Sequence, residues 1–227
     1  ADAAQGKPIL FFADRFDHWS TQGGDGYAAH VGGAQSVASD AMAAWWGERG
    51  MGTIPHALIA LFGGDTVAAT AAFHEEFPTT DLIALVDFTN DCAATALACA
   101  ERFGERLWGV RLDTSENLVD RALTGDSTQP LDRPIGDFKP NGVNPVLVEH
   151  VRRTLDRHGH EHVRIIVSGG FDPEKIALFE ATGAPVDAYA VGSSLLRGQN
   201  DFTADIVDPV AKVGRWARPG DRLSPVE

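Results

Sequence analysis

The sequence predicts an α/β fold built on parallel strands that form an open sheet or a barrel. Short apolar runs recur along the chain without in-out alternation, as is typical of strands covered by helices on both faces. Helical segments with clear start and stop signals separate these runs, and repeated strand–helix units of this length produce right-handed crossovers and parallel pairing. The 227 residues are 44% hydrophobic, which is sufficient for one domain with a sizeable core.

Six apolar runs are the candidate strands. They are Pro8–Ala13, Met51–Pro55, Leu82–Phe88, Leu107–Leu112, Val163–Val167 and Ala188–Val191. One helix is expected over roughly Ser36–Trp46, and three more are expected from Asn90 to Gly104, Asn144 to Gly159 and Asp172 to Gly183. The last three carry recognisable signals, because Asn and Asp cap helix starts, Pro fits the first turn and Gly ends helices.

One long irregular stretch, Thr124–Gly142, interrupts the strand–helix pattern. Loops of this length in compact domains are often functional or mobile. We expect residues 1–200 to form a barrel domain and residues 201–227 to add a C-terminal strand and an extended tail.

The chain is acidic, since 19 Lys and Arg against 32 Asp and Glu give a net charge of −13. This charge argues against a protein that binds a nucleic-acid backbone or an anionic membrane surface. A few arginines and backbone amides can still form a local anion pocket. There is no run of about 18 apolar residues and no signal-peptide layout at the N-terminus, so we expect a cytoplasmic protein without a membrane span.

The two cysteines, Cys92 and Cys99, lie seven residues apart in a predicted helix. Two helical turns separate their Cα atoms by about 10 Å, which is too far for a disulfide. A metal site would need further Cys or His ligands nearby. We therefore expect two small buried thiols in a reducing compartment.

Polar residues follow most of the predicted strands, and in parallel α/β folds the chemistry lies at the carboxyl ends of the strands. In chain order the candidates are Asp14 and Arg15, His56, Asp87, Arg111 and Asp113, Ser168-Gly169-Gly170, and Gly192-Ser193-Ser194. Two successive glycine-rich strand ends can expose backbone amides to a phosphate, as the last strands of a (β/α) barrel often do. The alternative is that these glycines only permit tight connections.

Two further features are candidate binding or catalytic groups. Arg111 and Asp113 lie two residues apart and point the same way, so Arg111 could meet a phosphate or carboxylate and Asp113 ribose hydroxyls or Mg²⁺. An internal ion pair is the alternative. His56 follows Pro55 where a helix begins and can titrate or act as a nucleophile, with a structural histidine as the alternative. The sequence contains no dinucleotide-binding, P-loop or α/β-hydrolase motif, and its histidines lack metal-binding spacing.

Several segments together resemble the barrel portion of nicotinate phosphoribosyltransferases. In order they are GTIPHALIALFGGDTVAA, LVDFTND, GVRLD, IGDFKPNGVNP, VSGGFDPEKI, DAYAVGSSLL and DFTADIV. The resemblance runs from about Pro8 to Val213. It implies an incomplete or open TIM-like (β/α) barrel, without most of the N-terminal region that precedes the barrel in that family. It also implies transfer of phosphoribosyl from phosphoribosyl pyrophosphate to nicotinate, in NAD biosynthesis and salvage.

The resemblance implies roles for individual residues. His56 matches a histidine that is phosphorylated when ATP hydrolysis is coupled to the transfer, and Mg²⁺ is the expected metal cofactor. Arg111 and Asp113 would handle the ribose and the diphosphate. The 5′-phosphate would bind at Ser168, Gly169, Gly170, Gly192 and Ser193, and the pyridine base at Phe12, Arg15 and Gln35.

One motif departs from the family, because Thr114-Ser115-Glu116 follows Asp113 where many relatives have Ser-Gly-Asp. The backbone reach of that glycine is therefore missing at Ser115. Three alternatives stay open: a quinolinate phosphoribosyltransferase, which decarboxylates and needs no ATP, a nicotinamide-using relative, and a non-catalytic barrel fragment or subunit that binds a nucleotide or a partner chain. The resemblance also implies a homo-oligomer, or a partner chain, that completes the site.

Overall fold

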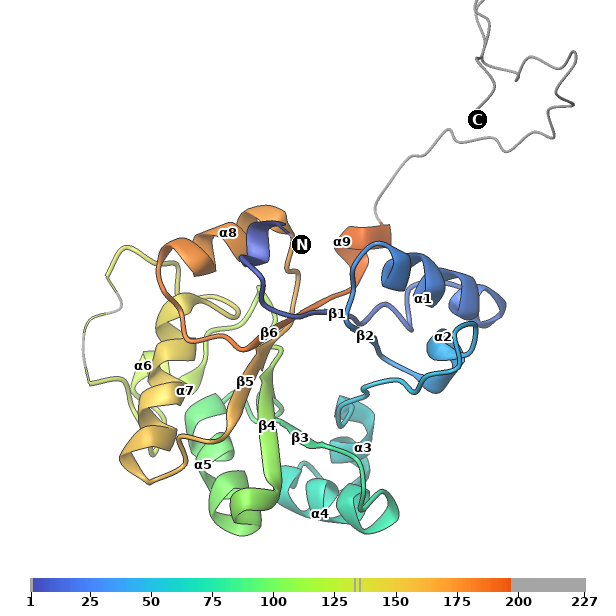
Figure 1. Cartoon of the computed structure of the whole chain (residues 1–227). Helices are drawn as coiled ribbons and strands as arrows, with labels where there is room; N and C mark the ends of the chain where they lie inside the picture. Colours follow the sequence, from blue (N-terminus) through green and yellow to red (C-terminus); the bar gives the residue numbers. More distant parts are fainter. Residues whose placement is uncertain (1, 133, 135, 197–227) are drawn as a thin grey trace, which may run out of the picture. The chain divides into compact units, whose positions relative to one another are not determined.

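The computed structural model describes residues 2–132, 134 and 136–196. Within these residues six parallel strands form one sheet: β1 (Ile9–Phe11), β2 (Ser36–Val37), β3 (Leu82–Leu85), β4 (Leu107–Leu112), β5 (Arg164–Val167) and β6 (Ala188–Val191). Their order across the sheet is β2-β1-β6-β5-β4-β3 (Figure 1). β1 pairs with β6, the last strand of the described residues, as the first and last strands of a (β/α) barrel do, while β2 and β3 are the two edges of the described sheet. The fold is an open parallel α/β barrel, of the predicted class.

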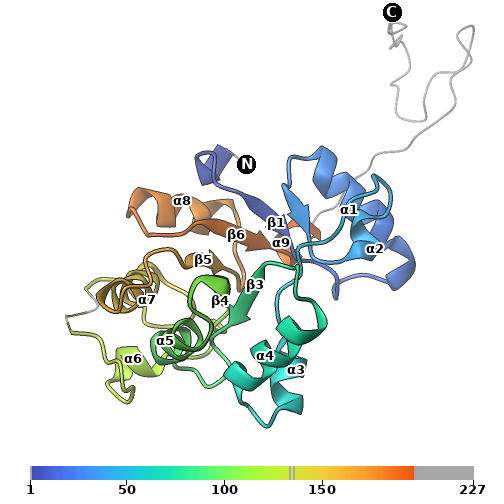
Figure 2. The same ribbon diagram turned by 60° about the horizontal axis from the view of Figure 1, so that its bottom comes forward.

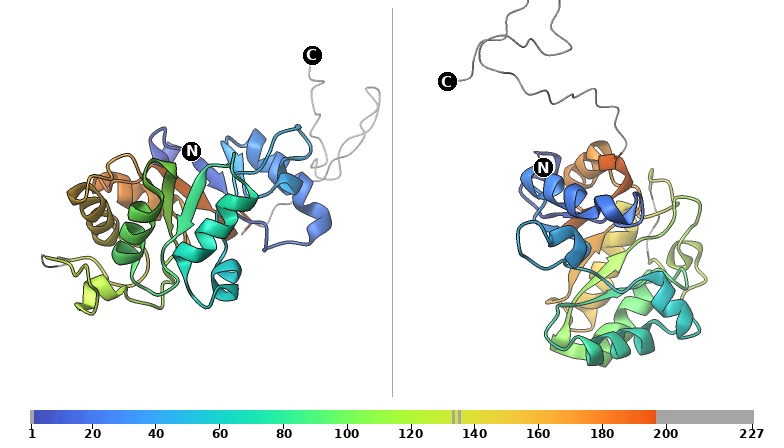
Figure 3. Two further views of the ribbon diagram at one scale, coloured as in Figure 1. Left: turned by 90° about the horizontal axis from the view of Figure 1, so that it is seen from below. Right: turned by 90° about the vertical axis from the view of Figure 1, so that its right-hand side faces the viewer.

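Helices connect the strands. They are α1 (Gln22–Val31), α2 (Asp40–Ala43), α3 (His56–Leu61), α4 (Thr66–Glu76), α5 (Cys92–Phe103), α6 (Arg121–Thr124), α7 (Pro145–Arg157), α8 (Pro173–Ala181) and α9 (Ser193–Leu196), with 3-10 turns η1 (Asp2–Ala4), η2 (Trp19–Thr21) and η3 (Gly104–Arg106). Figures 2 and 3 show α4, α5, α7 and α8 along the outer side of β3–β6. The predicted starts of α7 and α8 are confirmed, since Asn144 and Asp172 each cap their helix by accepting a backbone N–H.

The faces of β4 determine which side chains reach the inside of the barrel. Val110 and Leu112 are fully buried and pack in the large apolar cluster that also contains Leu147 and Val151 of α7. Because neighbouring residues of a strand point to opposite faces, Arg111 points to the inner side. Asp113, which follows the strand, points the same way.

Two predicted elements were wrong. Met51–Pro55 is not a strand, although the amide of Met51 still donates to the carbonyl of Val37 at 2.8 Å. Pro55 has no N–H to extend such a ladder. Ser36–Trp46 is not one helix, because its first two residues form β2 and Ser39 then caps the short α2.

The remaining expectations for the fold are met in part. Cys92 and Cys99 are buried free thiols, as predicted. The expected long loop begins after α6 and is joined to the rest of the chain by an isolated antiparallel bridge between Val119 and Asn141. In the described residues no helix has the length and apolar character needed to cross a membrane. The predicted strand and tail over residues 201–227 lie outside the described residues.

Candidate active site

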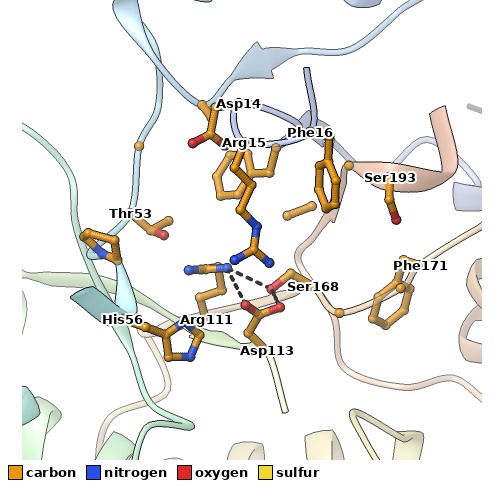
Figure 4. Close-up of a pocket in the computed structure, with 18 of the residues that line it drawn as sticks. Asp14, Arg15, Phe16, Thr53, His56, Arg111, Asp113, Ser168, Phe171 and Ser193 are labelled. Atoms are coloured by element: carbon orange, nitrogen blue, oxygen red, sulfur yellow. Dashed lines mark hydrogen bonds and ion pairs between the residues drawn. The ribbon is translucent and has the colours of Figure 1, made fainter. Parts of the chain in front are cut away.

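A cavity of about 310 Å³ lies at the carboxyl ends of the strands. Its walls come from residues at or just after the carboxyl ends of β1, β2, β4, β5 and β6 and from the segment 52–57 that enters α3 (Figure 4). Ten predicted site residues line it: Phe12, Arg15, His56, Arg111, Asp113, Ser168, Gly169, Gly170, Gly192 and Ser193. The fold thus gathers residues from five separate parts of the sequence at one place.

Arg111, Asp113 and Ser168 form a connected group at one wall of the cavity. Nη1 of Arg111 donates to Oγ of Ser168 at 3.0 Å and to Oδ2 of Asp113 at 3.2 Å. The hydroxyl of Ser168 also lies 2.8 Å from Oδ1 of Asp113 and donates to it. The internal ion pair considered from the sequence therefore exists, and it fixes the guanidinium rather than removing it from the cavity.

The environment of Arg111 favours an anionic ligand. The residue is only 9% exposed, and burial is the main cause that lowers the pKa of its guanidinium, with Asp113 and Asp87 opposing that effect. Its Nε is buried without a hydrogen-bond partner in the described residues. A buried donor of this kind costs free energy unless an acceptor arrives.

A second guanidinium faces the first. Arg15 follows β1, packs over the ring of Phe16 at 5.5 Å and points toward Arg111 (Figure 4). The positive charge of Arg15 contributes to lowering the pKa of Arg111. Two cations that share one cavity, with the Asp113 carboxylate bound to Arg111, suit a ligand with more than one negative charge.

Glycine is required after β5 and after β6 for different structural reasons. Gly169 and Gly170 adopt φ of +90° and +69°, a left-handed region that is unfavourable for other residues. Gly192 has no such φ, but a Cβ there would collide with the carbonyl oxygen of Phe12. Tight packing thus explains Gly192. The Gly169–Gly170 turn after β5 instead combines a left-handed backbone conformation with a position on the cavity wall.

His56 pairs with a buried carboxylate. It is the first residue of α3, and its Nε2 lies 3.2 and 3.1 Å from Oδ1 and Oδ2 of Asp87, which follows β3. The side chain of Asp87 is 8% exposed and that of His56 is 42% exposed. The Asp87 carboxylate therefore orients the His56 ring through Nε2, and Nδ1 is the ring nitrogen that does not face Asp87.

Some residues lie elsewhere than expected, and others were missed. Gln35 is exposed at the amino end of β2, where its N–H donates to Ile9, and it does not line the cavity. Thr53 and Phe171 line the cavity but were not singled out from the sequence. Phe171 directly follows the glycine pair and could have been considered for that reason, whereas nothing in the sequence around Thr53 signals its position.

The sequence of the chain is similar to those of known enzymes. No family model matches it. It is 31% identical over 220 residues to the nicotinate phosphoribosyltransferase pncB1 of Mycobacterium tuberculosis, covering 93% of this chain and 42% of that protein. A second enzyme of that name and organism, pncB2, is 27% identical over 207 residues, covering 90% of this chain and 39% of that protein. The chain is a relative of the nicotinate phosphoribosyltransferases. It spans less than half the length of the curated relatives that it matches.

Solved structures agree with this relationship. A nicotinate-nucleotide pyrophosphorylase from Pyrococcus furiosus superposes with a TM-score of 0.67 at 34% identity, covering 86% of this chain and 43% of that one. A nicotinate phosphoribosyltransferase from Porphyromonas gingivalis gives a TM-score of 0.58 at 15% identity, covering 89% and 48%. The second likeness concerns the fold alone.

Proposed function

We propose that this chain carries a phosphoribosyl-transfer site that uses nicotinate and phosphoribosyl pyrophosphate and forms nicotinate mononucleotide and pyrophosphate. The observation that supports it most is the group formed by Arg111, Asp113 and Ser168 beside the Gly169–Gly170 turn, facing Arg15 across one cavity. This arrangement offers cations, backbone amides and a carboxylate to a ligand that carries phosphates and hydroxyls. The sequence relationship supports the choice of the pyridine base.

Each side chain has a role in the proposed reaction. The glycine-rich strand ends would hold the 5′-phosphate, and Arg111 the diphosphate. Asp113 would accept hydrogen bonds from the ribose hydroxyls while its other contacts keep it in place. Phe12 would stack on the pyridine ring and Arg15 would meet the nicotinate carboxylate. Departure of pyrophosphate leaves positive character at C1′, so orientation and electrostatic stabilisation matter more than a strong base.

We further propose that ATP hydrolysis is coupled to the transfer through phosphorylation of His56. Because Nε2 faces Asp87, Nδ1 is the nitrogen that would attack the γ-phosphorus of ATP, with ADP leaving. Asp87 would hold the ring in the attacking orientation and stabilise its positive charge. Water would later cleave the phosphohistidine and restore the enzyme.

Mg²⁺ would bind at this site together with the diphosphate of the substrate, and not in a cage of protein ligands alone. Within the described residues no group of three or more His, Cys, Asp or Glu side chains could hold a metal ion. Of the described residues, Asp14 and Asp113 are the carboxylates that line the cavity, and Mg²⁺ commonly binds through one or two carboxylates together with substrate phosphates. When bound, the ion would neutralise charge on the leaving pyrophosphate.

A second candidate is the quinolinate-type reaction, favoured by the similarity to the nicotinate-nucleotide pyrophosphorylase. A base with two carboxylates would need an additional cation near the ring. Among the described residues, the arginines that line the cavity are Arg15 and Arg111, and Arg111 is the one assigned above to the diphosphate. This allocation favours a base with one carboxylate.

A non-catalytic role belongs to a different class, in which the chain binds a nucleotide or a partner chain without turnover. The site could also be completed by a second copy of the chain or by a partner. Activity of the purified chain alone, measured with its oligomeric state by light scattering, separates these possibilities. Turnover by the chain alone would exclude the non-catalytic role.

A base-exchange assay tests the proposal. Purified protein is given phosphoribosyl pyrophosphate, Mg²⁺ and radiolabelled nicotinate, nicotinamide or quinolinate, with and without ATP. We expect nicotinate mononucleotide from nicotinate alone, with a higher yield in the presence of ATP. Carbon dioxide release from quinolinate would favour the second candidate instead.

A further inference from the structure

We propose that Lys175 is a positioning residue for phosphate binding, which holds the carbonyl of Gly169 so that the N–H of Gly170 faces the cavity. The inference rests on the proposed function in taking the bound phosphate to be that of the phosphoribosyl group. Lys175 lies in the first turn of α8, directly after the glycine-rich end of β5. It is not one of the described residues that line the cavity, so its effect on a ligand would pass through the backbone.

The side chain of Lys175 folds back over the turn that precedes its helix. Its Nζ donates to the carbonyl oxygen of Gly169 at 2.9 Å and lies 4.3 Å from the centroid of the Phe171 ring. Phe171 is buried against Phe179 and Tyr189, which makes the ring a fixed support. A cation held over an aromatic face is stabilised there, so the ammonium has a defined position beside the carbonyl.

The charge of Lys175 is partly removed from water. Burial is the main cause that lowers the pKa of its ammonium, and the neighbouring carboxylates of Asp172, Glu116 and Asp113 oppose that effect. A desolvated ammonium needs acceptors for its three protons. The Gly169 carbonyl is one of these acceptors. Breaking this hydrogen bond would leave a partly buried ammonium proton without an acceptor, which costs free energy.

Peptide geometry connects this bond to the ligand. A trans peptide is planar, and its C=O and N–H point in opposite directions. A Gly169 carbonyl fixed on Lys175 therefore directs the N–H of Gly170 to the other side of the same plane. Both glycines line the cavity, and within the described residues neither of their N–H groups donates to another protein group. These are donors available to a phosphate.

Glycine makes this orientation dependent on an outside contact. Neither Gly169 nor Gly170 has a Cβ that would oppose a flip of the peptide between them, and a flip would present a carbonyl oxygen to the anion. A second carbonyl, two residues further along the chain, is also held, since Oγ of Ser194 donates to the carbonyl of Phe171 at 2.7 Å. The side chains of α8 and α9 thus keep two carbonyls of the turn occupied.

The test uses the full chain with Lys175→Met and Lys175→Arg, and Lys7→Met as a matched control. Lys7 is a partly buried lysine that pairs with Glu180 at 2.7 Å and does not line the cavity. Calorimetry gives the affinity for ribose 5-phosphate, and steady-state kinetics give the KM for each substrate. We expect Lys175→Met to weaken ribose 5-phosphate binding and raise the KM for phosphoribosyl pyrophosphate about tenfold. The KM for nicotinate and kcat should not change, Lys175→Arg should restore most of the affinity, and Lys7→Met should behave as the parent.

Two results would overturn the inference. One is an unchanged affinity for ribose 5-phosphate in Lys175→Met, or in Lys175→Leu, which also lacks a donor, if Lys175→Met does not fold. The other is a crystal structure of the variant in which the affinity is lost but the Gly169–Gly170 peptide keeps its orientation. If the parent binds ribose 5-phosphate and the variant binds it weakly, but neither forms nicotinate mononucleotide, the proposed function fails while this inference stands.

Discussion

The guanidinium of Arg111 at the end of β4 donates a 3.0 Å hydrogen bond to the hydroxyl of Ser168 just after β5. The two strands are neighbours in the sheet, with Leu112 opposite Val167. Since the same hydroxyl also contacts Asp113 at 2.8 Å, one serine side chain connects the cation and the carboxylate of the site. The position of the guanidinium in the cavity therefore depends on pairing between two strands.

Ser168→Ala should loosen this connection. Hydrogen bonds to charged groups contribute about 1.5–3 kcal/mol, so we expect the KM for phosphoribosyl pyrophosphate to rise about tenfold or more, with little change in the KM for nicotinate. Steady-state kinetics measure both. Ser127→Ala is the control, because the hydroxyl of Ser127 donates to Asp91 at 2.6 Å in a loop outside the cavity. Equal effects of the two variants would contradict the role of Ser168.

His56→Ala should abolish stimulation by ATP while slow ATP-independent transfer remains. The reason is that the variant lacks the nitrogen that would carry the phosphoryl group but keeps the residues that bind phosphoribosyl pyrophosphate. Initial rates with and without ATP, together with ³²P incorporation from γ-labelled ATP, measure the effect. His162→Ala is the control, a histidine 3.8 Å from the carboxylate of Glu105. Equal ATP stimulation in His56→Ala and the parent would exclude the phosphohistidine.

Arg15→Gln should weaken binding of the pyridine base. The substitution removes the cation expected to meet the nicotinate carboxylate, so the KM for nicotinate should rise about tenfold or more. Arg102→Gln is a matched control, since Arg102 is also exposed and lies 5.4 Å over the ring of Phe103, as Arg15 lies 5.5 Å over Phe16. A KM for nicotinate that is the same in both variants would remove Arg15 from the base site.

Because its two thiols are buried, the free energy of unfolding of the chain should fall at alkaline pH. Burial raises the pKa of Cys99 from 9.0 to about 12 and raises that of Cys92 as well. Below pH 9 both the folded and the unfolded thiol are protonated, so this contribution is fully present. Between pH 9 and about 12 only the unfolded chain loses the proton, and the free energy of unfolding falls by up to about 1.4 kcal/mol per pH unit for each thiol.

Urea unfolding of the parent and of Cys99→Ala across this pH range isolates the thiol, because tyrosines and lysines titrate in both proteins. We expect a shallower pH dependence in the variant. Parallel curves would mean that the Cys99 thiol ionises equally in the folded and unfolded chains.

Much of the fold could be predicted because it depends on local sequence. The strands Leu107–Leu112 and Ala188–Val191 have the predicted bounds, since continuous apolar runs between turn residues are a strong signal. The two-residue strand β2 was missed, because its pairing of Ser36 and Val37 with Leu10 and Phe11 is a tertiary contact. The sequence around it, rich in alanine, favours a helix by propensity.

The candidate site was predictable to the extent that its residues directly follow strands. Asp113 and the glycines that follow β5 and β6 were found by that rule, together with Arg111 near the end of β4, and the open barrel brings them together. The expected position of Gln35 depended on a resemblance alone, and the structure places that residue at the opposite end of its strand. The pairing of His56 with Asp87 joins residues 31 positions apart, which spacing alone does not indicate.

The central claim is that the ends of β4, β5 and β6 bind the phosphoribosyl donor. Calorimetric titration of the purified chain with phosphoribosyl pyrophosphate and Mg²⁺ tests it most directly, with Arg111→Met as the negative control. We predict one site per chain, competition by ribose 5-phosphate and loss of binding in the variant. No binding to the folded parent chain, or equal binding by the parent and Arg111→Met, would contradict the account.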